Sequence, residues 1–144
     1  MKIRANYVSN SSSSSFIVMY NDGVKIYFTD KKGKKKSDMS FSFDEFVDML
    51  ETRYNNWCAE STDVHSTCID SIIKQVKENY WDEKYAEKVI DRINEGRKKY
   101  SNIVYFDIAY QDEMLLNFLK AFNELDEVAI IHDSEEKISS EKDN

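Results

Sequence analysis

The last third of the chain constrains the fold most, because it reads as a strand, a helix and a second strand. Residues 103–110 are almost continuously apolar, as in a strand covered on both faces. Residues 114–125 repeat apolar side chains at helical spacing, and residues 128–132 form a second short apolar run. Two strands joined by a helix are normally parallel, with a right-handed crossover. The pattern therefore predicts a β-α-β unit.

The first third of the chain predicts further strands. Residues 1–8 alternate loosely between apolar and polar side chains, which is typical of a short strand. Residues 16–20 and 24–29 are rich in β-branched and aromatic side chains. Residues 21–23, Asn-Asp-Gly, suit the positive φ angles of a type I′ turn, so we expect these two segments to pair as a hairpin. An exposed, lysine-rich turn over residues 30–36 should follow.

A run of five serines, Ser11 to Ser15, separates the first two predicted strands. Serine hydroxyls compete for backbone hydrogen bonds and offer no apolar face. The run also lacks the glycines and the correctly spaced lysine of a phosphate-binding loop. We therefore expect an ordinary loop that joins two strands.

The first helix is marked by the residues around its start. Ser42 and Glu45 have the spacing of a capping box. Phe41 and Phe46 stand at the positions of a hydrophobic staple, which fixes the direction in which the chain enters a helix. Apolar side chains then recur at helical spacing, so a helix is expected over about residues 43–57.

Two more helices are expected before the β-α-β unit. Asp63 is placed to cap the first, whose apolar face would consist of Ile69, Ile72, Ile73, Val76 and Tyr80. Asp82 is placed to cap the second, and Gly96 to end it. The apolar face of this second helix would consist of Tyr85, Ala86, Val89, Ile90 and Ile93. The short connection between the two favours an antiparallel pair.

These elements together predict an α+β or α/β fold. The economical arrangement is one mixed β-sheet, made of the N-terminal hairpin and the C-terminal β-α-β unit, with about four helices packed on it. Residues 1–132 are expected to form a single α/β domain. Residues 133–144 contain Ile138 as their only large apolar side chain, so we expect a disordered acidic tail.

The net charge of −7 is unevenly distributed along the chain. Residues 1–36 carry eight basic and two acidic side chains, a local charge of +6, so residues 37–144 carry −13. This acidic body disfavours binding to nucleic acid through a phosphate-neutralising face. A protein partner with a basic surface is electrostatically easier to bind.

The sequence also bounds the compartment and the cofactors. There is no apolar stretch near the roughly 20 residues of a membrane span, and Lys2 and Arg4 are not followed by the apolar region of a signal peptide. We therefore expect a cytoplasmic protein without membrane contact, in which Cys58 and Cys68 are free thiols. No cofactor-binding motif is recognised, and no cofactor is predicted.

The N-terminal string resembles a pattern that opens many small uncharacterised proteins of bacteriophages and prophage-bearing bacteria. That pattern reads K-x-R-x-x-F-V-S-N-S-S-S-S-S-F followed by aliphatic residues, and the chain matches it from Lys2 to Val18, with Tyr7 where Phe is more usual. The resemblance implies a phage or mobile-element setting, and therefore the cytoplasm of an infected or lysogenic bacterium. It covers about the first 18 residues and implies no activity.

Asp107 is the most unusual single residue, because it interrupts the apolar run of residues 103–110. A buried carboxylate is costly unless it is paired, so Asp107 is expected to be either a site residue or hydrogen-bonded to a nearby element. If the two strands of the β-α-β unit are neighbours, an acidic cluster should gather near their C-terminal ends, formed by Asp107, Asp112, Glu113, His132 and Asp133. Such a cluster could hold a divalent ion, whereas Asp112 and Glu113 also favour a helix start through the helix dipole.

Two other sets of side chains are candidates, one for a metal or nucleophile site and one for a protein interface. Cys58, His65 and Cys68 are ligand types that zinc accepts, and either cysteine could pair with a histidine as a nucleophile, but their spacing matches no known motif. Cys68 also continues a helical apolar face, as a small buried side chain would. Large aromatic side chains near the predicted helix ends are candidate interface anchors, namely Tyr54, Trp57, Tyr80 and Trp81.

Lysines cluster in the predicted turn, at positions 31, 32, 34, 35 and 36. Such a run is typical of a solvated hairpin tip, and a basic patch that meets nucleic acid or the acidic C-terminal residues is the alternative.

No catalytic motif is recognised, so we favour a binding protein over an enzyme. The favoured function is a phage accessory protein that binds a host or phage protein through an acidic surface, for example as an anti-defence inhibitor. The alternatives are a small metal- or phosphate-dependent enzyme centred on Asp107, and a virion or assembly component.

Overall fold

The computed structural model of the protein describes residues 13–53, 62–78, 82–110 and 112–132. Its strands are β1 (Ser13–Tyr20), β2 (Lys25–Thr29), β3 (Lys35–Ser42), β4 (Asp63–Ser66), β5 (Asn102–Ala109) and β6 (Val128–His132). Its helices are α2 (Phe43–Arg53), α3 (Ile69–Glu78), α4 (Glu83–Gly96) and α5 (Glu113–Asn123). The mixed α and β content, with four helices in the described residues, confirms the predicted fold class. The strand predicted within residues 1–8 and the tail predicted for residues 133–144 lie outside the described residues.

The main sheet has four strands in the order β4-β5-β1-β6, and each neighbouring pair is antiparallel. Strands β5 and β6 therefore run parallel to each other, as their helical connection predicts, but β1 lies between them. The prediction of one mixed sheet is wrong, because β2 and β3 form a separate two-stranded sheet. Every residue of β1 is buried, which suits a strand with a neighbour on each edge and a helical layer on each face.

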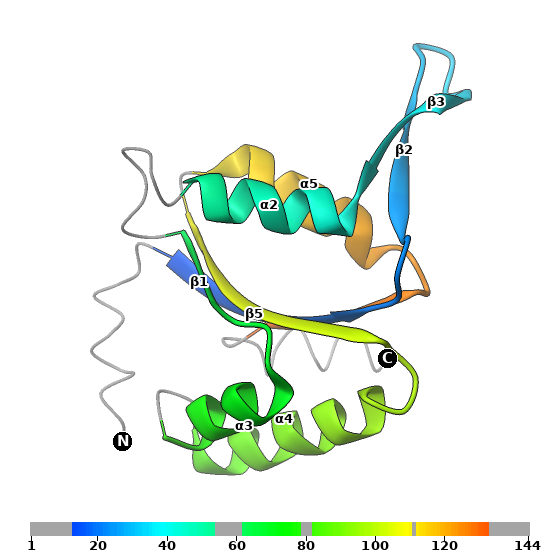
Figure 1. Cartoon of the computed structure of the whole chain (residues 1–144). Helices are drawn as coiled ribbons and strands as arrows, with labels where there is room; N and C mark the ends of the chain where they lie inside the picture. Colours follow the sequence, from blue (N-terminus) through cyan, green and yellow to red (C-terminus); the bar gives the residue numbers. More distant parts are fainter. Residues whose placement is uncertain (1–12, 54–61, 79–81, 111, 133–144) are drawn as a thin grey trace.

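The predicted hairpin between residues 16–20 and 24–29 is also wrong, since β2 pairs with β3 instead. Gly23 has the positive φ of +80° that its turn requires, but Asp22 does not, so the chain makes no type I′ turn there. The chain instead leaves the main sheet after β1, and the next two strands, β2 and β3, form the hairpin. The turn of that hairpin contains Gly33, with a φ of +81°. We call the β2–β3 hairpin the arm, and it projects from the body of the molecule (Figure 1).

Two helical layers cover the main sheet, with α2 and α5 on one face and α3 and α4 on the other (Figure 1). Even-numbered side chains of β1 and β5 point towards α2 and α5 and form a core rich in phenylalanine, including Phe16, Phe43, Phe46, Phe106 and Phe122. Odd-numbered side chains point towards α3 and α4 and form a second core, including Ile17, Met19, Ile72, Val89 and Tyr105. The sheet thus has the two covered faces that the apolar run of residues 103–110 predicts.

The predicted start of α2 is confirmed in detail. The backbone N–H of Ser42 donates to Oε1 of Glu45 at 2.8 Å, and the N–H of Glu45 donates to Oγ of Ser42 at 3.1 Å. The rings of Phe41 and Phe46 meet edge to face, with centroids 6.4 Å apart. These contacts satisfy two of the N–H groups that a helix start leaves free. The described part of the helix ends at Arg53, and the rest of the predicted range, residues 54–57, lies outside the described residues.

Of the two aspartates predicted to cap helices, one does so and the other does not. Asp82 caps α4, since its carboxylate accepts from the N–H groups of Lys84 and Tyr85, and α4 ends at Gly96 as predicted. Asp63 does not cap α3, because it lies in β4 and pairs with β5. Helix α3 begins at Ile69, where Oγ of Ser66 accepts from the N–H of Cys68 at 3.0 Å. None of the helices in the described ranges has the length and apolar character needed to cross a membrane.

Candidate functional site

Asp107 lies on β5, on the face of the sheet that is covered by α3 and α4. The antiparallel register places it opposite Ser15 on β1 and opposite Asp63 on β4. Directly opposed residues project to the same face of a sheet, so these three side chains form a row across three strands. Asp107 is buried, as the interrupted apolar run predicts.

The carboxylate of Asp107 has a partner on each side. The hydroxyl of Ser15 donates to Oδ1 at 2.5 Å, and Nε2 of His65 lies 3.0 Å from Oδ2. Ser15 is fully covered, whereas 31% of the His65 side chain is exposed. The three residues therefore form a hydrogen-bonded chain, the Ser15–Asp107–His65 cluster, which runs from the interior of the sheet to its edge. The partners of the buried carboxylate are thus side chains of the two neighbouring strands.

The serine run is not the loop that its sequence predicts. Ser13, Ser14 and Ser15 are buried residues of β1, and they pair with Ala109, Ile108 and Asp107 of β5. Ser11 and Ser12 lie outside the described residues. The backbone of these serines pairs with β5, and the hydroxyl of Ser15 donates to Asp107, so at Ser15 the side-chain hydrogen bond that would favour a loop is made inside the sheet.

The charge of Asp107 controls the protonation of His65. Burial of the imidazole lowers the pKa of His65, but the hydrogen bond and the charge of Asp107, together with the charge of Asp63, raise it by more. The net result is a pKa above the ordinary value of 6.5. The ring of His65 also packs on that of Tyr105, with centroids 4.7 Å apart. These contacts favour the charged imidazolium, in an ion pair with Asp107.

The order of the three groups decides what the cluster can do chemically. A serine nucleophile needs a histidine beside its hydroxyl and a carboxylate beyond that histidine. Here the carboxylate stands in the middle, so Ser15 donates to Asp107 and has no imidazole as its base. The geometry instead ties the edge strand β4 to β5. A second contact has the same effect, because Oγ1 of buried Thr62 accepts from the N–H of Ala109 at 2.9 Å.

Sequence reasoning identified Asp107 but missed its partners. The serine run predicts a loop at Ser15, Thr62 gives no signal, and the sequence predicts His65 only as a candidate metal ligand or base. The pattern of residues 63–66, in which Val64 stands between two polar side chains, was the available indication of an edge strand. Even so, sequence alone does not show that this strand lies against β5.

The structure does not bring the predicted acidic cluster together. Asp107 shares a face with Ser15, whereas His132 is paired with Phe16 and lies on the opposite face, its ring 4.6 Å from the Phe16 ring. The prediction assumed that β5 and β6 are neighbours, and β1 separates them. Asp133 lies outside the described residues.

Asp112 and Glu113 instead have the structural role that the helix dipole favours. Asp112 is buried and caps α5, where its carboxylate accepts from the N–H of Leu115 at 3.4 Å. Glu113 is exposed in the first turn of the same helix. Both carboxylates therefore lie beside the positive end of the α5 dipole.

Two of the three candidate metal ligands, His65 and Cys68, lie within the described residues. Cys68 is an exposed free thiol just before α3, so the prediction of a small buried side chain is wrong. Cys58 lies outside the described residues, as do the candidate interface residues Tyr54, Trp57, Tyr80 and Trp81. Within the part of the chain that the structure describes, no group of three or more His, Cys, Asp or Glu side chains is placed to hold a metal ion.

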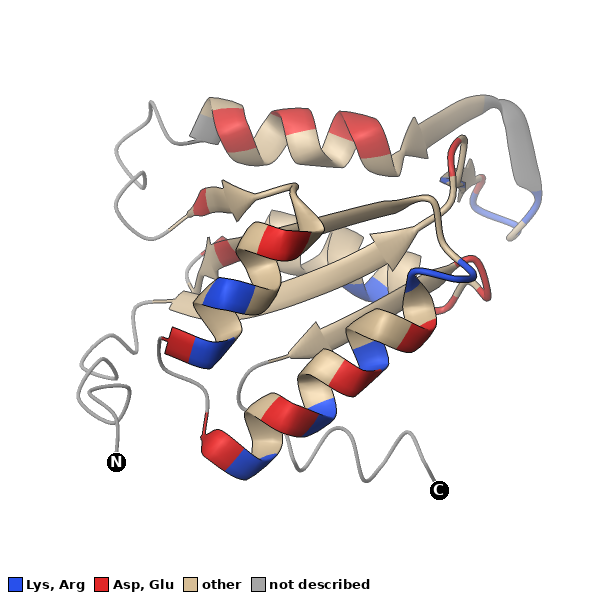
Figure 2. Cartoon of the chain, turned by 60° about the horizontal axis from the view of Figure 1, so that its bottom comes forward, with Lys and Arg blue, Asp and Glu red and all other residues tan. Residues whose placement is uncertain are grey.

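Two charged surfaces remain as candidates. Helix α2 exposes the carboxylates of Asp44, Glu45, Asp48 and Glu51, which we call the acidic face (Figure 2). The turn of the arm exposes Lys31, Lys32 and Lys34, as predicted; Lys35 and Lys36 fall in strand β3. This turn is shaped by Asp30, whose carboxylate accepts from the N–H groups of Lys32 and Lys34, both at 2.8 Å.

Comparisons with protein families, curated proteins and solved structures found no match to this chain. Inferences about function therefore rest on the two charged surfaces, the buried cluster and the N-terminal sequence pattern.

Proposed function

We propose that the protein is a non-catalytic accessory protein of a phage or mobile element, which binds a basic surface of a host or phage protein through the acidic face of α2. The observation that carries this proposal is the exposure of four carboxylates on a helix segment, residues 43–52, that contains no lysine or arginine. The phage setting is supported by the N-terminal sequence pattern alone. A host protein that handles nucleic acid presents a suitable basic surface, and occupying it would make this chain an anti-defence inhibitor.

The acidic face is held in a fixed orientation. The opposite side of α2 packs into the core through Phe43, Phe46 and Leu50, all fully buried. At the start of the helix, the hydroxyl of Tyr20 lies 3.4 Å from Asp44, and burial together with the charge of Asp44 raises the pKa of Tyr20 to about 12. A helix anchored in this way presents its carboxylates from a backbone that is already ordered, which lowers the cost of binding.

The spacing of these carboxylates is unfavourable for the isolated protein. Asp44 and Asp48 are four residues apart, and Asp48 and Glu51 are three apart, so each pair repels by roughly 0.2–0.5 kcal/mol. Asp44 and Glu45 gain from the helix dipole at the N-terminus, but Asp48 and Glu51 lie beyond the first turn. A basic partner would relieve this repulsion, which supports a binding role for the acidic face.

Helix α4 provides an internal comparison, because its exposed surface has a different charge pattern. Acidic and basic side chains alternate along it, with Glu83, Lys84, Glu87 and Lys88 all exposed (Figure 2). Lys84 and Glu87 stand three residues apart, as do Lys88 and Asp91, and opposite charges at that spacing attract each other on the helix surface. Residues 43–52 of α2 thus carry acidic side chains without basic ones, whereas both signs of charge are interspersed along α4.

An enzyme centred on Asp107 has less support. Its carboxylate is engaged by Ser15 and His65, and the other proposed members of the site lie at the start of α5 or on the opposite face of the sheet. The hydroxyl of Ser15 has a carboxylate beside it, and not the imidazole that activates a serine nucleophile in a Ser-His-Asp triad.

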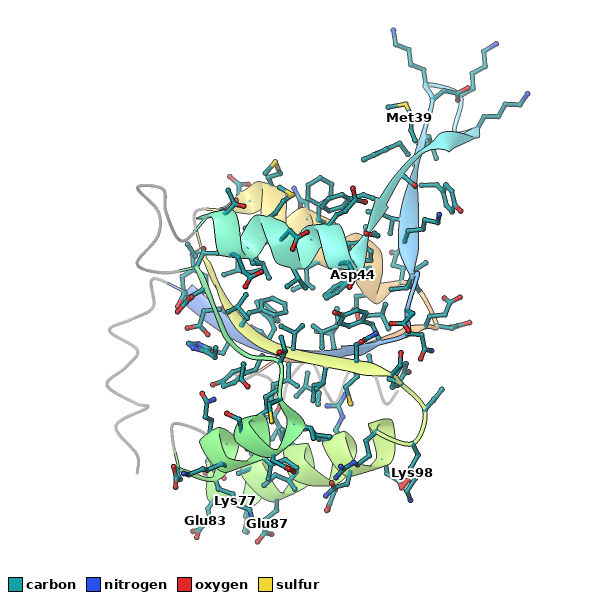
Figure 3. The ribbon with its side chains drawn as sticks, in the orientation of Figure 1. Met39, Asp44, Lys77, Glu83, Glu87 and Lys98 are labelled. Atoms are coloured by element: carbon teal, nitrogen blue, oxygen red, sulfur yellow. The ribbon has the colours of Figure 1, made fainter. Side chains whose placement is uncertain are left out.

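The test compares three tagged versions of the full chain in affinity purification from a bacterial lysate. The variant Asp48→Asn/Glu51→Gln removes two charges from the acidic face, and Glu83→Gln/Glu87→Gln removes two from α4 (Figure 3). We expect a partner that the wild type and the α4 variant recover and the α2 variant loses. Its recovery should fall as salt shortens the Debye length from about 10 Å at 0.1 M to about 3 Å at 1 M. Equal recovery by all three versions, or no partner at low salt, would contradict the proposal.

A further inference from the structure

A groove of about 720 Å³ lies between the arm and α5. All five residues of β2 line one side of it, from Lys25 to Thr29. The other side is formed by α5 and the residues that follow it, namely Met114, Asn117, Phe118, Ala121, Glu124 and Leu125. Its volume lies within the range of sites that bind ligands.

Two of the four exposed large apolar side chains of the described residues line this groove. The four are Phe28, Met39, Tyr110 and Met114, with exposed fractions of 38%, 46%, 49% and 44%. Phe28 and Met114 line the groove from its two sides, and Met39 lies on the other strand of the arm (Figure 3). Exposed apolar side chains that gather in one place mark interaction surfaces, whereas scattered ones need no explanation.

The base of the groove is rigid, because the arm is anchored there by aromatic contacts. The ring of Phe41, on β3, packs on Phe118 and Phe122 of α5, with centroid distances of 4.7 and 6.1 Å. Ile26 is paired with Phe41 across the hairpin and packs against the same core. The groove therefore exists without a ligand, which lowers the cost of binding.

Positive charge lies on the arm side of the groove, whereas Glu124 lines the side of α5. Lys25 lines the groove, and Lys31, Lys32 and Lys34 are exposed at the turn beyond Phe28 and Thr29. Strand β2 is five residues long, so the groove and the turn lie within the reach of an extended segment of about ten residues. Such a segment would meet apolar side chains first and lysines next.

We propose that this groove binds a short, acidic, amphipathic segment of a partner protein. Its apolar side chains would pack on Phe28, Met114 and Phe118, and its carboxylates would lie towards the lysines of the turn. A nucleic acid matches the observations less well, because a phosphate backbone could use the lysines but would leave the aliphatic part of the lining, such as Met114 and Leu125, without a partner. The inference does not rest on the proposed function, since the groove and the acidic face differ in place and in sign of charge.

The test uses a fluorescein-labelled synthetic peptide of about ten residues, with alternating leucine and glutamate in its first half and glutamate throughout its second half. Binding to the full chain is measured by fluorescence anisotropy and mapped by amide chemical shifts. We expect the shifts to centre on β2 and α5. Phe28→Ser/Met114→Ser should weaken binding roughly tenfold, whereas Tyr110→Ser, an equally exposed control, should leave it within about twofold.

Charge is tested with a second matched pair of variants. Lys31→Gln/Lys32→Gln/Lys34→Gln should weaken peptide binding several-fold, and Lys74→Gln/Lys84→Gln/Lys88→Gln, which removes three exposed lysines from α3 and α4, should not. All substituted side chains are exposed, and the amide spectra verify that each variant is folded. Equal binding of an all-glutamate peptide or a labelled single-stranded DNA would overturn the proposal, because the turn alone would then suffice. Shifts of the same amides on dilution of the free protein would also overturn it, since the occupant would then be a second copy.

Discussion

Nε2 of His65 lies 3.0 Å from Oδ2 of Asp107, which joins the edge strand β4 to its neighbour β5. The other oxygen of the same carboxylate accepts from Ser15 on β1, so one buried side chain links three adjacent strands. Strand β4 is only four residues long, and its register with β5 shifts between Val64 and Ser66. A short, irregular edge strand gains little stability from backbone hydrogen bonds to its neighbour. The side-chain contacts of Asp107 add to the stability of the pairing between β4 and β5.

Replacing Asp107 by alanine should therefore destabilise the protein by about 1–3 kcal/mol. The substitution leaves the covered hydroxyl of Ser15 without this acceptor and removes the counter-charge of His65. Asp107→Asn keeps an acceptor for Ser15 and should cost less. Urea denaturation of the two variants measures the difference, with Asp70→Ala, an exposed carboxylate in the first turn of α3, as the control. Loss of less than about 0.5 kcal/mol in Asp107→Ala would show that the cluster does not support the sheet.

The raised pKa of His65 predicts a pH dependence of stability with a definite sign. The folded state binds the imidazole proton more tightly than the unfolded chain, whose histidine titrates near the ordinary value of 6.5. The stabilisation is therefore fully present below about pH 6.5 and is lost as the pH rises through the folded-state pKa. We expect the difference in free energy of unfolding between wild type and His65→Gln to shrink as the pH rises from about 6.5 through the folded-state pKa of His65.

The control for this titration is the second histidine of the chain. His132→Gln should leave the pH dependence of the wild type in place, because His132 lies on the opposite face of the sheet from Asp107. Asp107→Asn should abolish it, since Asp107 is the main cause that raises the pKa of His65. A slope that persists in His65→Gln would assign the effect to another group.

Features set by neighbouring residues were predictable from the sequence. The reciprocal bonds of Ser42 and Glu45 depend on a spacing of three residues, and the cap at Asp82 depends on one side chain and the turn that follows it. The burial of Asp107 followed from the apolar residues on both sides of it. In each case the energies that decide the local structure act within one turn of helix or one strand.

Features that depend on strand pairing were not predictable. Phe16 pairs with Phe106 of β5 and with His132 of β6, both far along the chain, and not with a residue of the adjacent strand β2. The apolar character of both faces of β1 favoured the centre of a sheet over a hairpin, but this choice depends on partners that a local pattern does not show. The hydrogen bond from Ser15 to Asp107, across 92 positions, was hidden for the same reason.

The end of α4 shows how a correct prediction can rest on the wrong cause. The sequence predicts that Gly96 ends the helix, a role in which glycine usually adopts a positive φ. Among the described residues, however, only Gly23 and Gly33 have positive φ values. Instead, a Cβ at position 96 would overlap the Sδ and Cε atoms of Met19 on β1. Glycine thus lets α4 approach the sheet, where Met19 is buried.

This contact predicts an energetic coupling between Gly96 and Met19. Gly96→Ala forces the flexible end of the Met19 side chain to move, which offsets the gain of about 1 kcal/mol that alanine brings as the better helix former. Met19→Ala vacates the space that the new methyl group needs, so the double variant should be more stable than the sum of the two single effects by more than about 0.5 kcal/mol. Gly33→Ala is the control, because its positive φ makes it costly while no atom lies near its Cβ. Its effect should add to that of Met19→Ala, and equal coupling at positions 33 and 96 in urea denaturation would refute the close approach.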